Sequence, residues 1–196
     1  MKFSTAIALA VAAASSANAF TITFYNNCPY TVWPAIGKAP NGVPDTSVAY
    51  GTSIGEYGSA SFGISDTEIG IRAWGRTGCN SSGANCATGG CNGGLVCTDA
   101  GITSGVILSE YGYANFGADY GGERISWDLS HVDASINMPT LVTASDGAAQ
   151  AMCLVAPYGD CCPDDQAYSY ATDYAADRNS ALGTTFTHVF CPPTDW

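Results

Sequence analysis

Short runs in which apolar and polar residues alternate are the main pattern of this chain. Between residues 124 and 130 the apolar side chains of Ile125, Trp127 and Leu129 alternate with polar ones, and a period of two is typical of a half-buried β-strand. Comparable runs, separated by Gly, Asn, Pro and Ser, lie at residues 21–25, 31–33, 59–64, 69–74, 106–111 and 184–190. Many short strands with turn residues between them predict a β-sandwich or a barrel.

Other segments carry weaker signals. Residues 148–155 are the best candidate for a short helix, although the same run is equally compatible with a strand. Residues 78–94 contain six glycines and three cysteines, so disulfides must order this segment. Residues 146–180 are rich in Asp, Tyr and Ala, and we expect them to form a surface excursion, the nearest equivalent of a second lobe.

Residues 1–19 are predicted to be a signal peptide. Lys2 precedes an apolar stretch at residues 7–14, and Ala17 and Ala19 supply the small side chains that suit signal peptidase. We therefore expect a secreted, extracellular or cell-wall protein whose single domain covers residues 20–196. No later segment holds the roughly eighteen consecutive apolar residues of a membrane-spanning helix, so membrane insertion is not expected.

Charge narrows the set of partners. Asp and Glu number 17 against six Lys and Arg, and the formal net charge is −11. Phosphate backbones and anionic membrane surfaces would repel such a chain, which excludes nucleic acid, whereas neutral carbohydrate would not be repelled. The sequence lacks H-E-x-x-H and C-x-x-C spacings, so neither a metal nor a cofactor is expected, and we predict a monomer.

Nine cysteines follow the predicted leader, at positions 28, 79, 86, 91, 97, 153, 161, 162 and 191. Secretion permits disulfides between them. Because nine is an odd number, at least one thiol must be free, capped or paired with another molecule.

Several motifs occur in a fixed order along the chain. Residues 20–33 read FTITFYNNCPYTVW, and residues 72–79 read RAWGRTGC, followed by three further cysteines. Residues 108–111 read LSEY, residues 127–139 read WDLSHVDASINMP, and residues 190–192 read FCP. Together these motifs resemble those of the thaumatin-like family. The chain is similar to a short, small-type member, like the pathogenesis-related proteins of class 5.

The resemblance implies an all-β fold, a flattened antiparallel β-sandwich with a reduced disulfide-stapled lobe and loops. It also implies the disulfides Cys28–Cys191, Cys79–Cys86 and Cys91–Cys97. Among the remaining cysteines, Cys161 or Cys162 is the one without a partner, and we favour a bond between Cys153 and Cys162. The cysteine of the family's T-F-T-C stretch is replaced in this chain, near Thr187 and His188.

The resemblance further implies an acidic cleft that acts on β-1,3-glucans. Four residues match the family's cleft: Arg72, Glu110, Asp128 and Asp133. Glycoside hydrolysis needs one carboxylic acid to protonate the leaving oxygen and one carboxylate on the other side of the bond. We hypothesise that Glu110 is the acid, that Asp133 or Asp128 is the base or nucleophile, and that Arg72 organises the carboxylates.

Two more substrate-binding residues are predicted. Trp74 shares a strand face with Arg72, which places a cation beside an aromatic platform of the kind that stacks on sugar rings. Asp173 is the best positional match for the fifth acid of the family's set, with Asp164 and Asp165 as competitors.

The leading functional prediction is binding of β-1,3-glucan or another neutral cell-wall polysaccharide, with weak endo-β-1,3-glucanase activity, in cell-wall modification or antifungal defence. The alternative is a non-catalytic secreted carbohydrate-binding or defence protein. In that case Arg72, Glu110 and Asp128 form an ion-pair network that braces adjacent strands, and Asp133 caps a turn. A sequon that begins at Asn80 also predicts N-glycosylation there.

Overall fold

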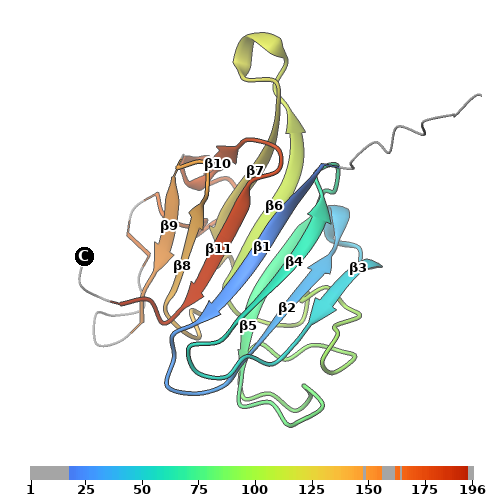
Figure 1. Cartoon of the computed structure of the whole chain (residues 1–196), viewed down its shortest axis with the longest axis vertical. Coiled ribbons are helices and arrows are strands. Elements are labelled where there is room, and N and C mark those ends of the chain that lie inside the picture. Colours follow the sequence, from blue (N-terminus) through green and yellow to red (C-terminus); the bar gives the residue numbers. More distant parts are fainter. Residues whose placement is uncertain (1–17, 148, 156–161, 164, 194–196) are drawn as a thin grey trace, which may run out of the picture.

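The computed structural model describes residues 18–147, 149–155, 162–163 and 165–193, in which two β-sheets lie face to face (Figure 1). The strands are β1 (Ala19–Asn26), β2 (Val32–Lys38), β3 (Asp45–Gly51), β4 (Ser59–Ser65), β5 (Ile71–Thr77), β6 (Leu108–Asn115), β7 (Glu123–Ser130), β8 (Thr140–Ala144), β9 (Gln150–Cys153), β10 (Arg178–Ser180) and β11 (Thr185–Phe190). Short 3-10 turns occur at η1 (Pro40–Gly42), η2 (Ala118–Tyr120) and η3 (Tyr174–Ala176). Residues 1–17 of the predicted signal peptide lie outside the described residues. No helix in the described ranges is long and apolar enough to cross a membrane.

The two sheets differ in strand order. One sheet has the order β4-β1-β11-β8-β9, and the other has the order β10-β7-β6-β5-β2-β3. Pairing is antiparallel except between β1 and β11, which run parallel and bring the two ends of the domain together. The β6–β7 hairpin extends beyond both sheets and carries η2 at its tip (Figure 1).

Alternation along the strands explains the core between the sheets. In β1, Phe20, Ile22 and Phe24 are fully buried, whereas the threonines between them are partly exposed. From β11, the Phe186 ring lies 4.9 Å from the ring of Tyr111 and 5.4 Å from that of Trp127. Each large side chain that leaves water in this way stabilises the fold by about 1.5–3 kcal/mol.

The strands predicted from alternation are all present, with shifts of a few residues at their ends. Within residues 148–155 the described segment Gln150–Cys153 forms β9, so the strand interpretation holds there and the helix interpretation was wrong. Three strands in the described ranges were not predicted, β3, β8 and β10, and β10 has only three residues. The exposed edge strand β3 has only one buried residue, and β8 is buried along most of its length, so neither alternates clearly.

The four disulfides among the described residues agree with the predicted pairing. The structure contains Cys28–Cys191, Cys79–Cys86, Cys91–Cys97 and Cys153–Cys162. Cys28 follows β1 and Cys191 follows β11, so this bond ties the two parallel strands at one end. Cys161, the cysteine left over, lies outside the described residues.

The connection between β5 and β6, residues 78–107, lies over the outer face of β5. Arg76 is fully buried beneath it, and its guanidinium donates hydrogen bonds to the carbonyl oxygens of Trp33, Gly83, Gly94 and Leu95 at 2.6–3.1 Å. Burial lowers the pKa of Arg76 to about 10. A strand residue thus orders a connection that has no regular secondary structure of its own.

Candidate functional site

Three charged side chains form a row across the outer face of the six-stranded sheet. Arg72 on β5 pairs with Glu110 on β6, and Glu110 pairs with Asp128 on β7. Residues directly opposite each other on antiparallel strands have Cβ atoms about 4.5–5.5 Å apart, so the three side chains are neighbours. The Nε atom of Arg72 lies 3.2 Å from Oε1 of Glu110 and donates a hydrogen bond to it.

This row lines a cavity of about 460 Å³. Asp133 and Tyr168 line the same cavity, together with part of the β5–β6 connection from Gly101 to Val106. The structure therefore brings four of the predicted site residues together: Arg72, Glu110, Asp128 and Asp133.

Asp128 has the most unusual environment in the row. Its Oδ1 atom is enclosed and has no hydrogen-bond partner among the residues that the structure describes. Burial raises the pKa of Asp128 well above its ordinary value of 3.8, and the nearby charges of Glu110 and Asp177 raise it further. Both effects disfavour the charged form. Asp128 therefore keeps its proton to a higher pH than a free carboxyl group does.

Glu110 has a different environment. Its side chain is 33% exposed and is paired with Arg72, whose side chain is 23% exposed. Sequence reasoning made Glu110 the acid, yet it is Asp128 that the fold encloses. The row contains two adjacent carboxyl groups in contrasting surroundings, the arrangement that separates an acid from a base in one site.

Two residues of the site were not predicted from the sequence. Tyr168 lines the cavity, and its pKa is raised to about 12, first by burial and then by the charges of Asp177 and Asp128. Asp177 accepts a hydrogen bond from Oγ of Ser126 at 2.7 Å. Both residues come from the segment before β10, where no periodic pattern marks which side chains face the sheet.

Asp173 lies apart from the row. It lines a second cavity, of about 410 Å³, together with His131 and Asp165. Its Oδ2 atom accepts hydrogen bonds from the backbone N and the Oγ of Ser169. The structure thus does not bring Asp173 or Asp165 to the first cavity, and Asp164 lies outside the described residues.

Trp74 does not offer a platform for a sugar. Its side chain is fully buried, and its Nε1 donates a hydrogen bond to the carbonyl oxygen of Gly89 at 3.0 Å. The prediction placed Trp74 on the correct strand face but did not anticipate that residues 78–107 cover that part of the face. Tyr168 is the aromatic residue that lines the first cavity.

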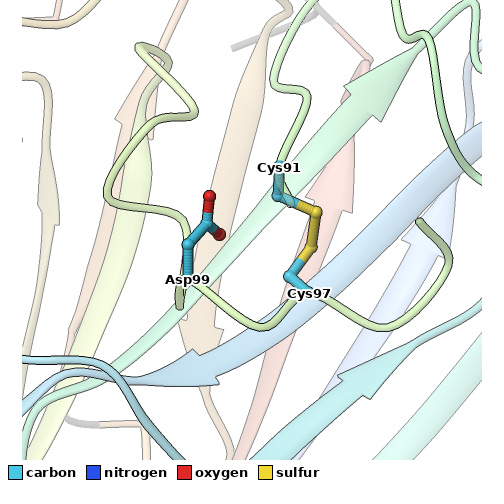
Figure 2. Close-up of side chains that lie close together, drawn as sticks. All are labelled: Cys91, Cys97 and Asp99. Atoms are coloured by element: carbon cyan, nitrogen blue, oxygen red, sulfur yellow. A yellow bond between two sulfur atoms is a disulfide. The ribbon is translucent and has the colours of Figure 1, made fainter. Parts of the chain in front are cut away.

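A cluster of potential metal ligands has a structural explanation instead. Cys91, Cys97 and Asp99 have ligand atoms within 4.8 Å of one another (Figure 2). The two sulfur atoms are bonded to each other, and the Asp99 carboxylate accepts hydrogen bonds from the backbone N atoms of Asn92 and Gly101. A disulfide lacks the thiolate that binds a metal, so this group orders the loop.

The predicted glycosylation residue is accessible. Asn80 is exposed, and its Oδ1 accepts hydrogen bonds from the backbone N and Oγ of Ser82 and from the backbone N of Ala84. Modification of Asn80 stays a prediction.

Comparison with known proteins places the chain in a family. A family model described as the Thaumatin family matches residues 26–191. A thaumatin-like protein of Oryza sativa subsp. japonica is 32% identical over 196 residues, which cover 95% of this chain and 93% of the relative. The thaumatin-like pathogenesis-related protein 2 of Avena sativa is 34% identical and covers 92% of this chain, with 91% of its own length aligned.

A solved structure supports the fold assignment. The thaumatin-like xylanase inhibitor TLXI has a TM-score of 0.58 and 22% sequence identity, and the match covers 87% of this chain and 99% of that one. These likenesses agree with the order of motifs, the two sheets and the disulfides described above. The chain belongs to the thaumatin family.

Proposed function

We propose that this protein is secreted and binds β-1,3-glucan, or a similar neutral cell-wall polysaccharide, in the cavity beside β5, β6 and β7, and that it hydrolyses the glucan slowly. The observation that carries the proposal is the enclosed carboxyl group of Asp128 next to the ion pair of Glu110 and Arg72. Four disulfides are typical of an oxidising, extracellular environment.

The cavity suits a neutral sugar. The hydroxyl groups of a glucan can donate to the carboxylates of Glu110 and Asp133 and accept from Arg72, while Tyr168 supplies an aromatic face. A neutral chain is also not repelled by a protein whose net charge is −11.

Slow hydrolysis needs a proton donor and a second carboxylate. Asp128, with its raised pKa, fits the donor better than Glu110 does, and Glu110 or Asp133 is then the second carboxylate. In such a site the separation of the two carboxyl groups decides the stereochemical outcome, about 5–5.5 Å for retaining enzymes and roughly 6.5–9.5 Å for inverting ones.

The alternative function is binding without cleavage, as in a secreted defence protein. The ion pair between Arg72 and Glu110 supports it, since this contact also braces β5 against β6. Binding and hydrolysis are therefore tested separately.

Replacing Arg72 by Gln is expected to weaken binding of a laminarin oligosaccharide about tenfold, because it removes a charged donor from the cavity, an interaction worth roughly 1.5 kcal/mol. Isothermal titration calorimetry measures this. The matched control is Lys38→Gln, which removes a cation that is paired with Asp45 and Glu68 away from the cavity. If both variants bind like the parent, the proposed location of the site is wrong.

Asp128→Asn and Glu110→Gln are each expected to lower reducing-sugar release from laminarin more than tenfold, since general acid catalysis contributes about 10²–10⁴. The parent's rate is expected to fall as pH rises through the raised pKa of Asp128, because the donor must be protonated. Asp173→Asn, in the second cavity, is the control and keeps the parental rate. Equal rates in all variants would leave only the binding function.

A further inference from the structure

Asp66 is a buried acid that does not line the cavity of the proposed glucan site. Its side chain is 2% exposed. The Oδ1 atom accepts a hydrogen bond from the backbone N of Gly183 at 3.1 Å, whereas Oδ2 is enclosed without a partner among the described residues. A buried carboxylate oxygen without a partner is costly, so this environment calls for a donor.

The carboxyl group lies at the start of β1. Asp66 directly follows β4, and Gly183 precedes β11, while β1 lies between these two strands in the sheet. The hydrogen bond between Asp66 and Gly183 therefore crosses the first end of β1. The backbone N of Asp66 also donates to the carbonyl oxygen of Asn18 at 3.1 Å, a contact that cleavage before Phe20 removes. Phe20 pairs with Ile64, two residues before Asp66, and this pairing does not depend on the residues in front of Phe20.

The described residues supply no cation to Asp66. Their ion pairs involve Lys38 and Arg72, and neither reaches it. The cavity beside Asp66, of about 400 Å³, is also lined by Asn18, Tyr113 and Glu123. Glu123 accepts a hydrogen bond from the Tyr113 hydroxyl at 2.7 Å, so the second acid of this cavity already has a partner.

Processing of the chain can supply the missing charge. Hydrolysis of the Ala19–Phe20 bond by a signal peptidase consumes one water, leaves the new carboxylate on the released leader, and leaves a protonated amine on Phe20. Phe20 is held in place because its side chain is fully buried in the core. The new ammonium group then lies at the same strand end as the Asp66 carboxyl group.

We infer that Asp66 is the built-in acceptor for the α-ammonium group of Phe20, and that this pair forms only after the leader has been removed. The inference rests on the predicted cleavage after Ala19 and is independent of the proposed glucan site. It makes the contribution of Asp66 to stability larger in the processed protein than in a form that keeps residues in front of Phe20.

The test compares two secreted forms, one that begins at Phe20 and one that retains residues 16–19, each with and without Asp66→Asn. Asn keeps an oxygen that can accept from Gly183 but removes the charge. In the form that begins at Phe20, Asp66→Asn is expected to lower the thermal midpoint by roughly 5 °C or more, and in the extended form by much less. Mass spectrometry of protein secreted with its own leader should give Phe20 as the first residue.

A second readout is direct. With ¹⁵N-labelled phenylalanine, NMR titration should show that the amine of Phe20 binds its proton at least tenfold more tightly than an ordinary α-amine, whose pKa is about 7.7–8.0. Asp66→Asn should abolish this difference, while Glu123→Gln should change it less. Equal destabilisation of both forms by Asp66→Asn, an ordinary titration of the amine, or a different first residue each overturns the inference. Laminarin binding plays no part in any of these outcomes.

Discussion

Replacing Arg76 by Met is expected to lower the free energy of unfolding by about 4 kcal/mol or more, the cost of leaving several buried carbonyl groups without a donor. Arg76 is fully buried and donates to carbonyl oxygens of β2 and of the β5–β6 connection. Met fills much of the same volume but donates no hydrogen bond, so the loss measures the polar contacts and not a cavity.

The contacts of Arg76 explain why the effect should be large. The Gly94 and Leu95 carbonyl oxygens lie 2.6 and 2.8 Å from the guanidinium nitrogens. The charge of Asp99 acts on Arg76, but no described carboxylate forms an ion pair with it, so the carbonyl groups carry most of its solvation. Without the guanidinium, residues 83–95 would lose the hydrogen bonds that hold this segment against β5.

Urea denaturation with the disulfides intact measures this prediction. The matched control is Arg124→Met, because Arg124 is partly exposed and its Nε donates to the carbonyl oxygen of Gly121 in the β6–β7 hairpin. We expect the control to change the free energy of unfolding by less than about 1 kcal/mol. Similar midpoints for the two variants would show that the carbonyl contacts of Arg76 do not order the connection.

Arg76 and Trp74 also show what the sequence could not predict, namely that another segment covers them. Alternation along β5 correctly assigns both to the outer face, but alternation cannot say what covers that face. The cover is a connection without periodicity. It approaches so closely that a Cβ atom added to Gly101, which has a φ of +72°, would lie 2.8 Å from the Trp74 ring. A close approach of this kind requires glycine but leaves no other mark in the sequence.

The row of charged residues was easier to predict than the acids after β9. Arg72, Glu110 and Asp128 lie in strands, so sequence motifs fix their order and alternation fixes their face. Asp173 and Asp177 lie in a segment with only the short elements η3 and β10. Asp173 lines the second cavity, whereas Asp177, only four residues later, raises the pKa of Asp128. The segment's pairing with β7 decides this, and pairing is a tertiary property.

The protein is expected to lose about 4 to 5 kcal/mol of stability through His188 alone as the pH falls from 6.5 to 3. His188 on β11 is 2% exposed, and its ring lies 4.6 Å from that of Phe190. Nδ1 is 3.1 Å from Oγ of Ser109, and Nε2 is in hydrogen-bond contact with Oγ1 of Thr140. Burial lowers the pKa of His188 from 6.5 to about 3.

The direction follows from which state takes up the proton. Above pH 6.5 the imidazole is neutral in both states, and His188 adds no pH dependence. Between pH 6.5 and 3 the unfolded chain is protonated while the folded protein is not, so each pH unit costs about 1.4 kcal/mol. Asp128 acts in the opposite direction, because its raised pKa lets the folded protein bind a proton first.

The difference between the parent and His188→Gln cancels the contribution of Asp128 and of every other group that the substitution leaves unchanged. Gln is neutral at all pH values and can still donate and accept between Ser109 and Thr140. Urea denaturation at several pH values should therefore show a stability difference that shifts in favour of the variant by about 1.4 kcal/mol per unit below pH 6.5. His131→Gln, at the partly exposed histidine after β7, is the control and should follow the parent. A constant difference between parent and His188→Gln from pH 7 to pH 4 would mean that the core admits a charged imidazole.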